Sequence, residues 1–207
     1  ARPWGCITRS SVEARAFPPG AEGRLAAFAE LLALGIASAE HRRQLEQLTL
    51  TDPLTGLANR RAFTEHLAAD AARARRHGRP LALAMLDIDG FKAINDRLGH
   101  AAGDRVLVEL ATRLGRLSRS FETVARIGGE EFAWILPETD AAGSVAAVER
   151  ARREIAAIEV DRVRGITCSV GVCDIAVATS VDDLLRCADR ALYRAKNAGR
   201  DRVEAAV

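Results

Sequence analysis

Gly128-Gly129-Glu130-Glu131-Phe132 places two carboxylates directly after a pair of glycines. The runs on either side, residues 123–127 and 132–136, are rich in β-formers, so the segment predicts a hairpin whose glycine turn requires positive φ. Glycine also lets a phosphate group approach the backbone closely. Two adjacent acids at a hairpin tip repel each other, and the alternative interpretation is a solvated turn without a ligand.

A second pair of acids follows a short apolar run. Residues 81–86 are typical of a strand buried on both faces, and Asp87 and Asp89 stand at its end. Open α/β sheets bind ligands at this end of a strand, where an unpaired carboxylate is costly. A divalent cation shared by Asp87 and Glu130 would neutralise it, and oxygen ligands suit Mg²⁺ that holds phosphates. Asp89 has a second interpretation, as a cap of the following helix.

These acids belong to a set of motifs that resembles the GGDEF family of diguanylate cyclases. In chain order the motifs are DPLTGLANRR at 52–61, DIDGFKAIND at 87–96, Gly99-His100 with Gly103-Asp104, the GGEEF variant of the hairpin at 128–132, and ALYRAKNAGR at 191–200. The resemblance implies an α+β fold, related to the palm of polymerases and to nucleotidyl cyclases, with a mainly antiparallel central sheet flanked by helices.

Periodicity in the chain agrees with that fold. Apolar spacing predicts helices that include the segment up to Leu98 and the ranges 102–117, 141–158 and 180–198, with Ser180 as the N-cap of the last. Residues 166–172 are expected to form a strand, and 201–203 a short closing strand.

The resemblance also implies the chemistry. Asp87 and Glu130 would hold Mg²⁺ (or Mn²⁺) together with the backbone carbonyl of Ile88, and Glu131 would be a further ligand or would assist deprotonation. The 3′-OH of one GTP would attack the α-phosphorus of another and expel pyrophosphate. Two such attacks would give cyclic di-GMP, with Asp87, Glu130 and Glu131 as the catalytic residues.

The base and the phosphates have separate candidates. Asn95 and Asp104 would bind guanine, because a carboxylate accepts from the N1–H and exocyclic amine that adenine lacks on that edge. Without the resemblance these two residues would be a surface amide and an acid at a helix start. The candidate phosphate-binding residues are Gly90, Phe91 and Lys92 through backbone N–H groups, Gly128 and Gly129 at the turn, and Lys196 and Arg200. The last two also fit a cationic helix end with no ligand.

A regulatory site is predicted to be degenerate. Many relatives bind their product at an Arg-x-x-Asp motif upstream of the hairpin, and the aligned residues here are Arg119 and Glu122. The acid is one methylene longer than aspartate, while the arginine remains able to bind a phosphate or a guanine edge. We therefore expect product inhibition to be weak or absent.

Residues 1–50 lie outside the cyclase resemblance, which we assign to a domain at 51–207. Residues 1–21 resemble the closing strand of a truncated GAF sensory domain, and 22–50 are expected to form a stalk helix. Its apolar stripe consists of Leu25, Phe28, Leu32, Ile36, Ala39, Leu45 and Leu48. The stripe fits either a sister helix in a homodimer with facing active sites or the missing sensor.

Composition narrows the class of protein. The 207 residues carry a net charge of +2 and a pI near 8.5, which gives no reason to expect a nucleic-acid partner. No segment approaches the roughly 20 apolar residues of a membrane span, and we expect a cytoplasmic protein without a signal peptide. Cys6, Cys168, Cys173 and Cys187 lack metal or redox spacing and are interpreted as free thiols. The alternative function is a catalytically silent module that binds GTP or cyclic di-GMP.

Overall fold

The computed structural model describes residues 20–48 and 50–206. By its internal contacts the chain divides into two units, Ala1–Thr49 and Leu50–Val207. The strand-like fragment expected within residues 1–21 falls almost entirely outside the described residues.

A single five-stranded sheet forms the centre of the second unit. Its strands are β1 (Leu81–Ile88), β2 (Thr123–Arg126), β3 (Glu131–Pro137), β4 (Cys168–Asp174) and β5 (Val203–Ala206), in the spatial order β2-β3-β1-β4-β5. Only the β4 and β5 pair is parallel. The other three pairs are antiparallel, so the α+β class with a mainly antiparallel sheet is confirmed.

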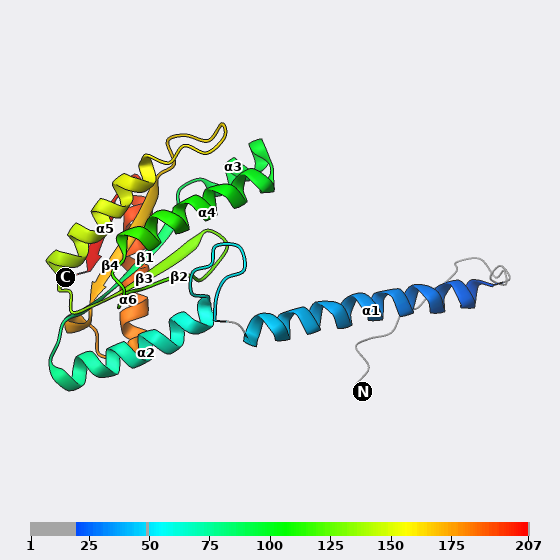
Figure 1. Ribbon diagram of the computed structural model, residues 1–207, viewed down its shortest axis with the longest axis horizontal. Helices are drawn as coiled ribbons and strands as arrows, with labels where there is room; N and C mark the ends of the chain where they lie inside the picture. The colour runs from blue at the N-terminus through cyan, green and yellow to red at the C-terminus, as the bar shows by residue number, and fades with distance from the viewer. Residues whose placement is uncertain (1–19, 49, 207) are drawn as a thin grey trace. The chain divides into compact units, whose positions relative to one another are not determined.

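Helices cover both faces of this sheet (Figure 1). On one face lie α4 (His100–Leu117) and α5 (Ala141–Ala156), which pack against every second side chain of the central strands. The helix α3 (Phe91–Leu98) packs beside α4. On the other face lie α2 (Arg60–His77) and α6 (Val181–Asn197). Seven of the eight residues of β1 are buried, as the apolar run predicts for a central strand covered twice.

Helix starts follow local side-chain chemistry. The side chain of Ser180 accepts a hydrogen bond from the amide of Asp183, which confirms the predicted N-cap of α6. The closing strand begins later than expected, at Val203 rather than at residue 201. Arg200 and Asp201 have φ of 62° and 47°, a left-handed conformation that no strand residue adopts.

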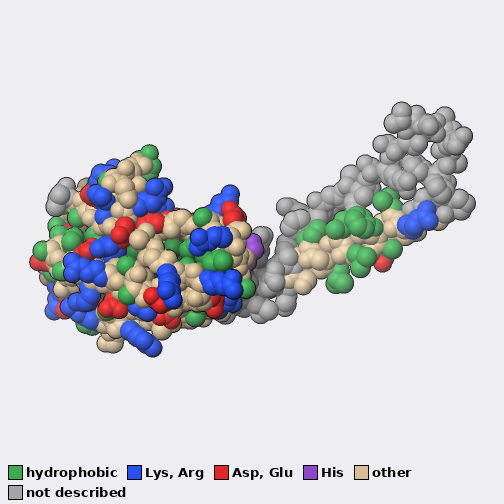
Figure 2. All heavy atoms as spheres, turned by 90° about the horizontal axis from the view of Figure 1, so that it is seen from above, with side chains coloured by type: hydrophobic (Ala, Val, Ile, Leu, Met, Phe, Trp, Pro, Cys, Tyr) green, Lys and Arg blue, Asp and Glu red, His purple; other side chains and the backbone are tan. Residues whose placement is uncertain are grey.

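In the first unit, α1 (Ala21–Leu48) confirms the expected long helix. Several large apolar side chains on it are exposed, namely Phe28, Leu31, Leu32, Leu34 and Ile36, and Figure 2 shows apolar side chains gathered along this helix. None of the helices in the described part of the chain has the length and apolar character to cross a membrane.

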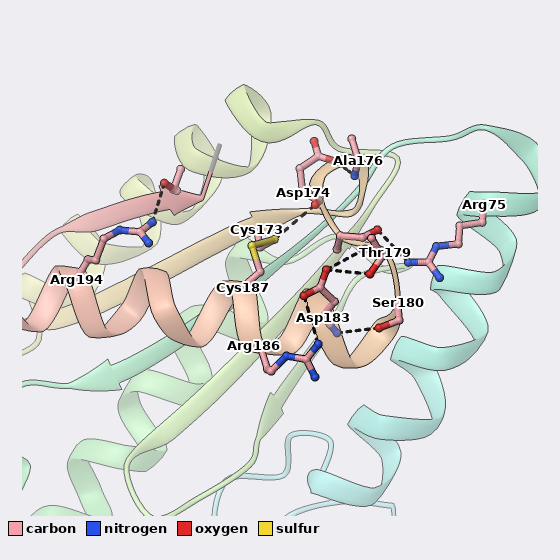
Figure 3. Close-up of a disulfide and its surroundings, with 12 residues drawn as sticks. Arg75, Cys173, Asp174, Ala176, Thr179, Ser180, Asp183, Arg186, Cys187 and Arg194 are labelled. Carbon is pink, nitrogen blue, oxygen red and sulfur yellow. Dashed lines mark hydrogen bonds and ion pairs between the residues drawn. A yellow bond between two sulfur atoms is a disulfide. The ribbon is translucent and has the colours of Figure 1, made fainter.

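The expectation of free thiols is wrong for two cysteines. Figure 3 shows Cys173 on β4 bonded to Cys187 on α6, with a Cα to Cα distance of 5.8 Å that suits a disulfide. A Cβ on Gly171 would overlap the backbone of α6, so the helix lies unusually close to the strand. Cys168 is a buried free thiol, as expected, and Cys6 lies outside the described residues.

Candidate active site

The acids of the two motifs meet at one end of neighbouring strands. In the register of β1 and β3, Asp87 lies opposite Glu131, and the amide of Ile88 donates to the carbonyl of Glu130 at 3.4 Å. Asp87 is buried, while Glu131 is exposed. The antiparallel pairing thus brings together residues that are far apart in the chain, as the sequence predicts.

Asp87 has a cationic partner within the chain. The ammonium of Lys196, near the end of α6, lies 2.7 Å from Oδ2 of Asp87. The family resemblance predicts that Lys196 binds substrate phosphates. Without a ligand its charge neutralises that of the buried Asp87 carboxylate. The lysine therefore sits at the acid cluster itself and not at a separate helix surface.

Glu130 lies in an unfavourable environment for a charged carboxylate. Burial raises its pKa, and the charges of Asp87 and Glu131 raise it further while Lys196 opposes them. Within residues 20–48 and 50–206, no hydrogen bond to its carboxylate is found. Glu130 consequently gains from any cation that binds beside it.

The glycine turn differs from the prediction of positive φ. Neither Gly128 nor Gly129 is among the residues with positive φ. The reason is that the turn is wider than a two-residue hairpin loop, because the amides of Ile127 and Gly128 both donate to the carbonyl of Glu131, at 3.0 and 3.3 Å. A Cβ on Gly128 would overlap the carboxylate of Glu131, so glycine is needed there for close side-chain approach.

An ion pair holds the tip of this hairpin and was not anticipated. The guanidinium of Arg126 donates to the carbonyl of Gly129 at 2.8 and 3.1 Å and lies 3.2 Å from Oδ1 of Asp52. Burial raises the pKa of Asp52, but hydrogen bonds from Thr55 and the charge of Arg126 outweigh it and hold the pKa below its usual range. The start of the domain is thereby tied to the residue before Glu130.

The donor set fits a metal that is completed by substrate. Among the described residues, no three His, Cys, Asp or Glu side chains converge as a closed metal site. Mg²⁺ ordinarily takes one or two carboxylates plus substrate phosphates, and Glu130 beside Asp87 supplies such a pair. The side chain of Glu131 folds over Gly128, so the structure does not gather it into the pair.

The two candidate base-binding residues lie on adjacent helices. Asn95 is on α3, and its Oδ1 is buried without a hydrogen-bond partner in the described structure. A Cβ on Gly103 of α4 would overlap that oxygen, and Asp104 is the next residue of α4 and is exposed. An unpaired buried acceptor is costly, which is consistent with a ligand donor at this position.

The start of α3 offers free backbone donors. Gly90 is the N-cap residue, with φ of 68°, and no side chain caps the helix. The amide of Ala93 donates to the carbonyl of Gly90 at 2.9 Å, whereas those of Phe91 and Lys92 are left for an anion. Arg200 is exposed just beyond α6, and its guanidinium pairs with no acid in the described part of the chain.

Asp89 does not cap α3, which corrects the alternative considered for it. Its carboxylate accepts hydrogen bonds from the hydroxyls of Ser169 and Thr167, at 2.7 and 2.8 Å, and from the amide of Asp201 at 3.1 Å. Helix capping fails because Gly90 intervenes in a left-handed conformation and turns the helix away.

Arg119 and Glu122 lie at the other end of the β2–β3 hairpin. The side chain of Glu122 is only 3% exposed, and its Oε2 accepts from the indole N–H of Trp134 at 3.0 Å and the amide of Arg119 at 2.9 Å. The Arg119 guanidinium is exposed, 3.7 Å from Glu122, beside a cavity of about 290 Å³. The two side chains are therefore close, and Oε2 of Glu122 already accepts two hydrogen bonds from the protein.

Comparison with known proteins agrees with these features. The family described as "Diguanylate cyclase, GGDEF domain" matches residues 49–202. Diguanylate cyclase DgcP of Pseudomonas aeruginosa is 46% identical over 169 residues, which cover 80% of this chain and 25% of that protein. This chain spans about a quarter to a half of the length of the curated relatives it matches.

Two solved structures resemble the fold. The coiled coil and GGDEF domain of DgcB from Caulobacter crescentus, in complex with c-di-GMP, is 37% identical with a TM-score of 0.74 and covers 90% of this chain and 100% of its own. The active GGEEF domain of a diguanylate cyclase from Vibrio cholerae is 34% identical with a TM-score of 0.69, covering 72% and 97%. The chain belongs to the GGDEF family of diguanylate cyclase domains.

Proposed function

We propose that this chain carries the diguanylate cyclase activity of its protein, condensing two GTP into cyclic di-GMP and two pyrophosphates. The observation that carries the proposal is the pair of acids at the adjoining ends of β1 and β3, where Glu130 has a raised pKa beside Asp87. The Vibrio cholerae relative with an active GGEEF domain supports it, because the hairpin here has the same five residues.

Asp87, Glu130 and the carbonyl of Ile88 are proposed to hold Mg²⁺ or Mn²⁺, with Glu131 either as a fourth ligand or as a group that assists deprotonation. Bound there, the ion would stabilise charge on the attacking and leaving oxygens of nucleotidyl transfer. Glu131 is exposed at the hairpin and is our candidate for assisting removal of the 3′-OH proton.

The remaining residues are proposed to orient one GTP in each domain. Asn95 and Asp104 would bind the guanine edge, which the unpaired Oδ1 of Asn95 supports. The amides at Gly90, Phe91 and Lys92 would bind phosphate oxygens at the uncapped start of α3. At the turn Gly128 and Gly129 would admit the nucleotide, and the cations Lys196 and Arg200 would contact the terminal phosphates.

One GTP per domain requires two domains, so we propose a homodimer with facing active sites that is joined through α1. The exposed apolar side chains of that helix, such as Phe28 and Leu32, would be buried against the same helix of a second copy. The Caulobacter crescentus relative, whose structure comprises a coiled coil and a GGDEF domain, supports this arrangement.

Weak product inhibition is proposed on the basis of Glu122. Its carboxylate already accepts from Trp134 and Arg119, so a ligand would have to displace donors that are in place. Calorimetric titration with cyclic di-GMP tests this point. A dissociation constant near ~1 μM that Arg119→Ala abolishes would overturn it, since this corresponds to roughly 8 kcal/mol of binding.

The test of the activity is incubation with GTP and Mg²⁺, in parallel with ATP, and chromatographic identification of products. We expect cyclic di-GMP from GTP alone. If GTP binds but no product forms, a dimer forced by a fused coiled coil separates two explanations. Product from the forced dimer would mean that the chain pairs poorly, whereas its absence would favour the silent binding module.

A further inference from the structure

Asp89 joins three segments that are distant in the sequence. It stands in the turn from β1 to α3, and its carboxylate accepts from the Ser169 and Thr167 hydroxyls at the start of β4, at 2.7 and 2.8 Å. The same carboxylate accepts from the amide of Asp201, beyond α6, at 3.1 Å. Its own amide donates to the carbonyl of Thr167 at 2.9 Å. Both oxygens of the Asp89 carboxylate thus accept hydrogen bonds from the protein, two at Oδ2 and one at Oδ1.

The segment that Asp89 holds beyond α6 has an uncommon backbone. Arg200 and Asp201 are consecutive residues with φ of 62° and 47°, and neither is glycine. Non-glycine residues in this conformation are strained and persist only where surrounding contacts determine them. Here the amide of Asp201 is fixed by Asp89, its carboxylate pairs with Arg152 of α5, and the amide of Arg200 donates to Ala195 at 3.0 Å.

Arg200 depends on this turn for its position. Its guanidinium is exposed and, among the described residues, makes no ion pair, so no side-chain contact directs it. Asp89 is also the residue before Gly90, where the uncapped first turn of α3 begins. One carboxylate therefore fixes the spacing between the α3 amides and the backbone that carries Arg200.

We propose that Asp89 is a positioning residue for triphosphate binding, which holds the turn carrying Arg200 against the start of α3. The inference rests on the proposed function, because it takes Arg200 as a ligand of the terminal phosphates. Its consequence is selective: loss of Asp89 weakens binding of the triphosphate and spares binding of the guanine and the first phosphate.

The experiment compares 3′-deoxy-GTP with 3′-deoxy-GMP by calorimetry in Mg²⁺, because without a 3′-OH neither can be condensed. We expect Asp89→Ala to weaken the binding of 3′-deoxy-GTP roughly 10-fold or more, which is the size of one charge-assisted contact. The binding of 3′-deoxy-GMP should weaken less than about 2-fold. Asp89→Asn keeps an acceptor and should fall between Asp89→Ala and wild type, which preserves the test if Asp89→Ala folds poorly. In an Arg200→Ala background Asp89→Ala should add less than about 2-fold.

Asp140→Ala is the matched control, because Asp140 caps α5 through the amide of Gly143 at 2.8 Å and its loss destabilises the fold away from the phosphates. This variant should bind both nucleotides as wild type does. Equal weakening of both nucleotides by Asp89→Ala, or an undiminished effect without Arg200, would overturn the inference. If Arg200→Ala alone leaves 3′-deoxy-GTP binding unchanged, the assigned role of Arg200 in the proposed function fails, and the positioning role with it.

Discussion

Two glutamates of the β2–β3 hairpin stand at opposite ends of it and differ in what surrounds them. Glu122 is nearly inaccessible, yet its carboxylate receives donors from Trp134 and the Arg119 backbone. Glu130 is more accessible, but its pKa is raised by burial and by neighbouring acids. A buried acid with partners stabilises the fold, whereas an acid without them is held in place at a cost.

The contrast teaches how to separate structural from functional acids in this fold. Residue type does not distinguish the two, since each is a glutamate of the same hairpin, and burial alone would select the wrong one. Glu122 already has donors from the protein at Oε2 and the Arg119 guanidinium 3.7 Å from Oε1. Glu130, beside Asp87, has no such donors among the described residues and would be stabilised most by a bound cation. Its raised pKa therefore marks the active end of the sheet.

The largest expected effect comes from Glu130→Gln, which removes the charge and keeps the shape. We expect turnover of GTP to fall by about 10³-fold or more, the size found when a transition-state contact is lost. Stability without metal should not fall, because a repulsive charge has gone. Chromatography of the products measures turnover, and urea unfolding of the same sample measures stability. A variant that retains substantial turnover would break the metal assignment.

Glu122→Ala should show the opposite pattern. It leaves the buried indole N–H of Trp134 without an acceptor, and we expect the free energy of unfolding to fall by about 2–4 kcal/mol. Turnover per folded molecule should stay within about 3-fold of wild type. Glu122→Gln, which retains an acceptor oxygen, serves as the control and should lose less. If Glu122→Ala is as stable as wild type, Glu122 does not stabilise the fold and the contrast with Glu130 fails.

The pH dependence of Glu130 sharpens the same contrast. Its pKa in the folded state lies above the ordinary value of 4.5, so the folded state binds the proton more tightly than the unfolded state does. The destabilising effect is absent below about pH 4.5 and is complete once the pH exceeds the folded pKa. Without metal, the stability advantage of Glu130→Gln over wild type should therefore grow as the pH rises through this window. Urea unfolding across pH measures it, and an advantage that shrinks with pH would contradict the assignment.

Much of the fold was predictable because it is encoded locally. The apolar run before Asp87 identifies a strand covered on both faces, and Ser180 marks the start of α6. The meeting of Asp87 with the hairpin acids was predictable from the motifs taken together, since strand ends are where such ligands gather.

What escaped prediction depends on tertiary contact between residues whose spacing carries no signal. Cys173 and Cys187 meet only because α6 packs closely on β4. The partners of Asp89 come from two distant segments, and a helix cap is the simpler local interpretation of an acid before a helix. The shape of the hairpin turn likewise depends on an ion pair, between Arg126 and Asp52, that periodicity does not reveal.

The smallest effect is expected for Asp52, a third acid that behaves as Glu122 does. Its pKa lies below the ordinary value of 3.8, because hydrogen bonds from Thr55 and the charge of Arg126 outweigh burial. The carboxylate thus contributes stability that is present above about pH 3.8 and is lost as the pH falls through the folded pKa. Asp52→Asn should lower stability by about 1 kcal/mol at neutral pH and by less in acid. A deficit that stays constant with pH would show that the amide, and not the lost charge, perturbs the hairpin tip.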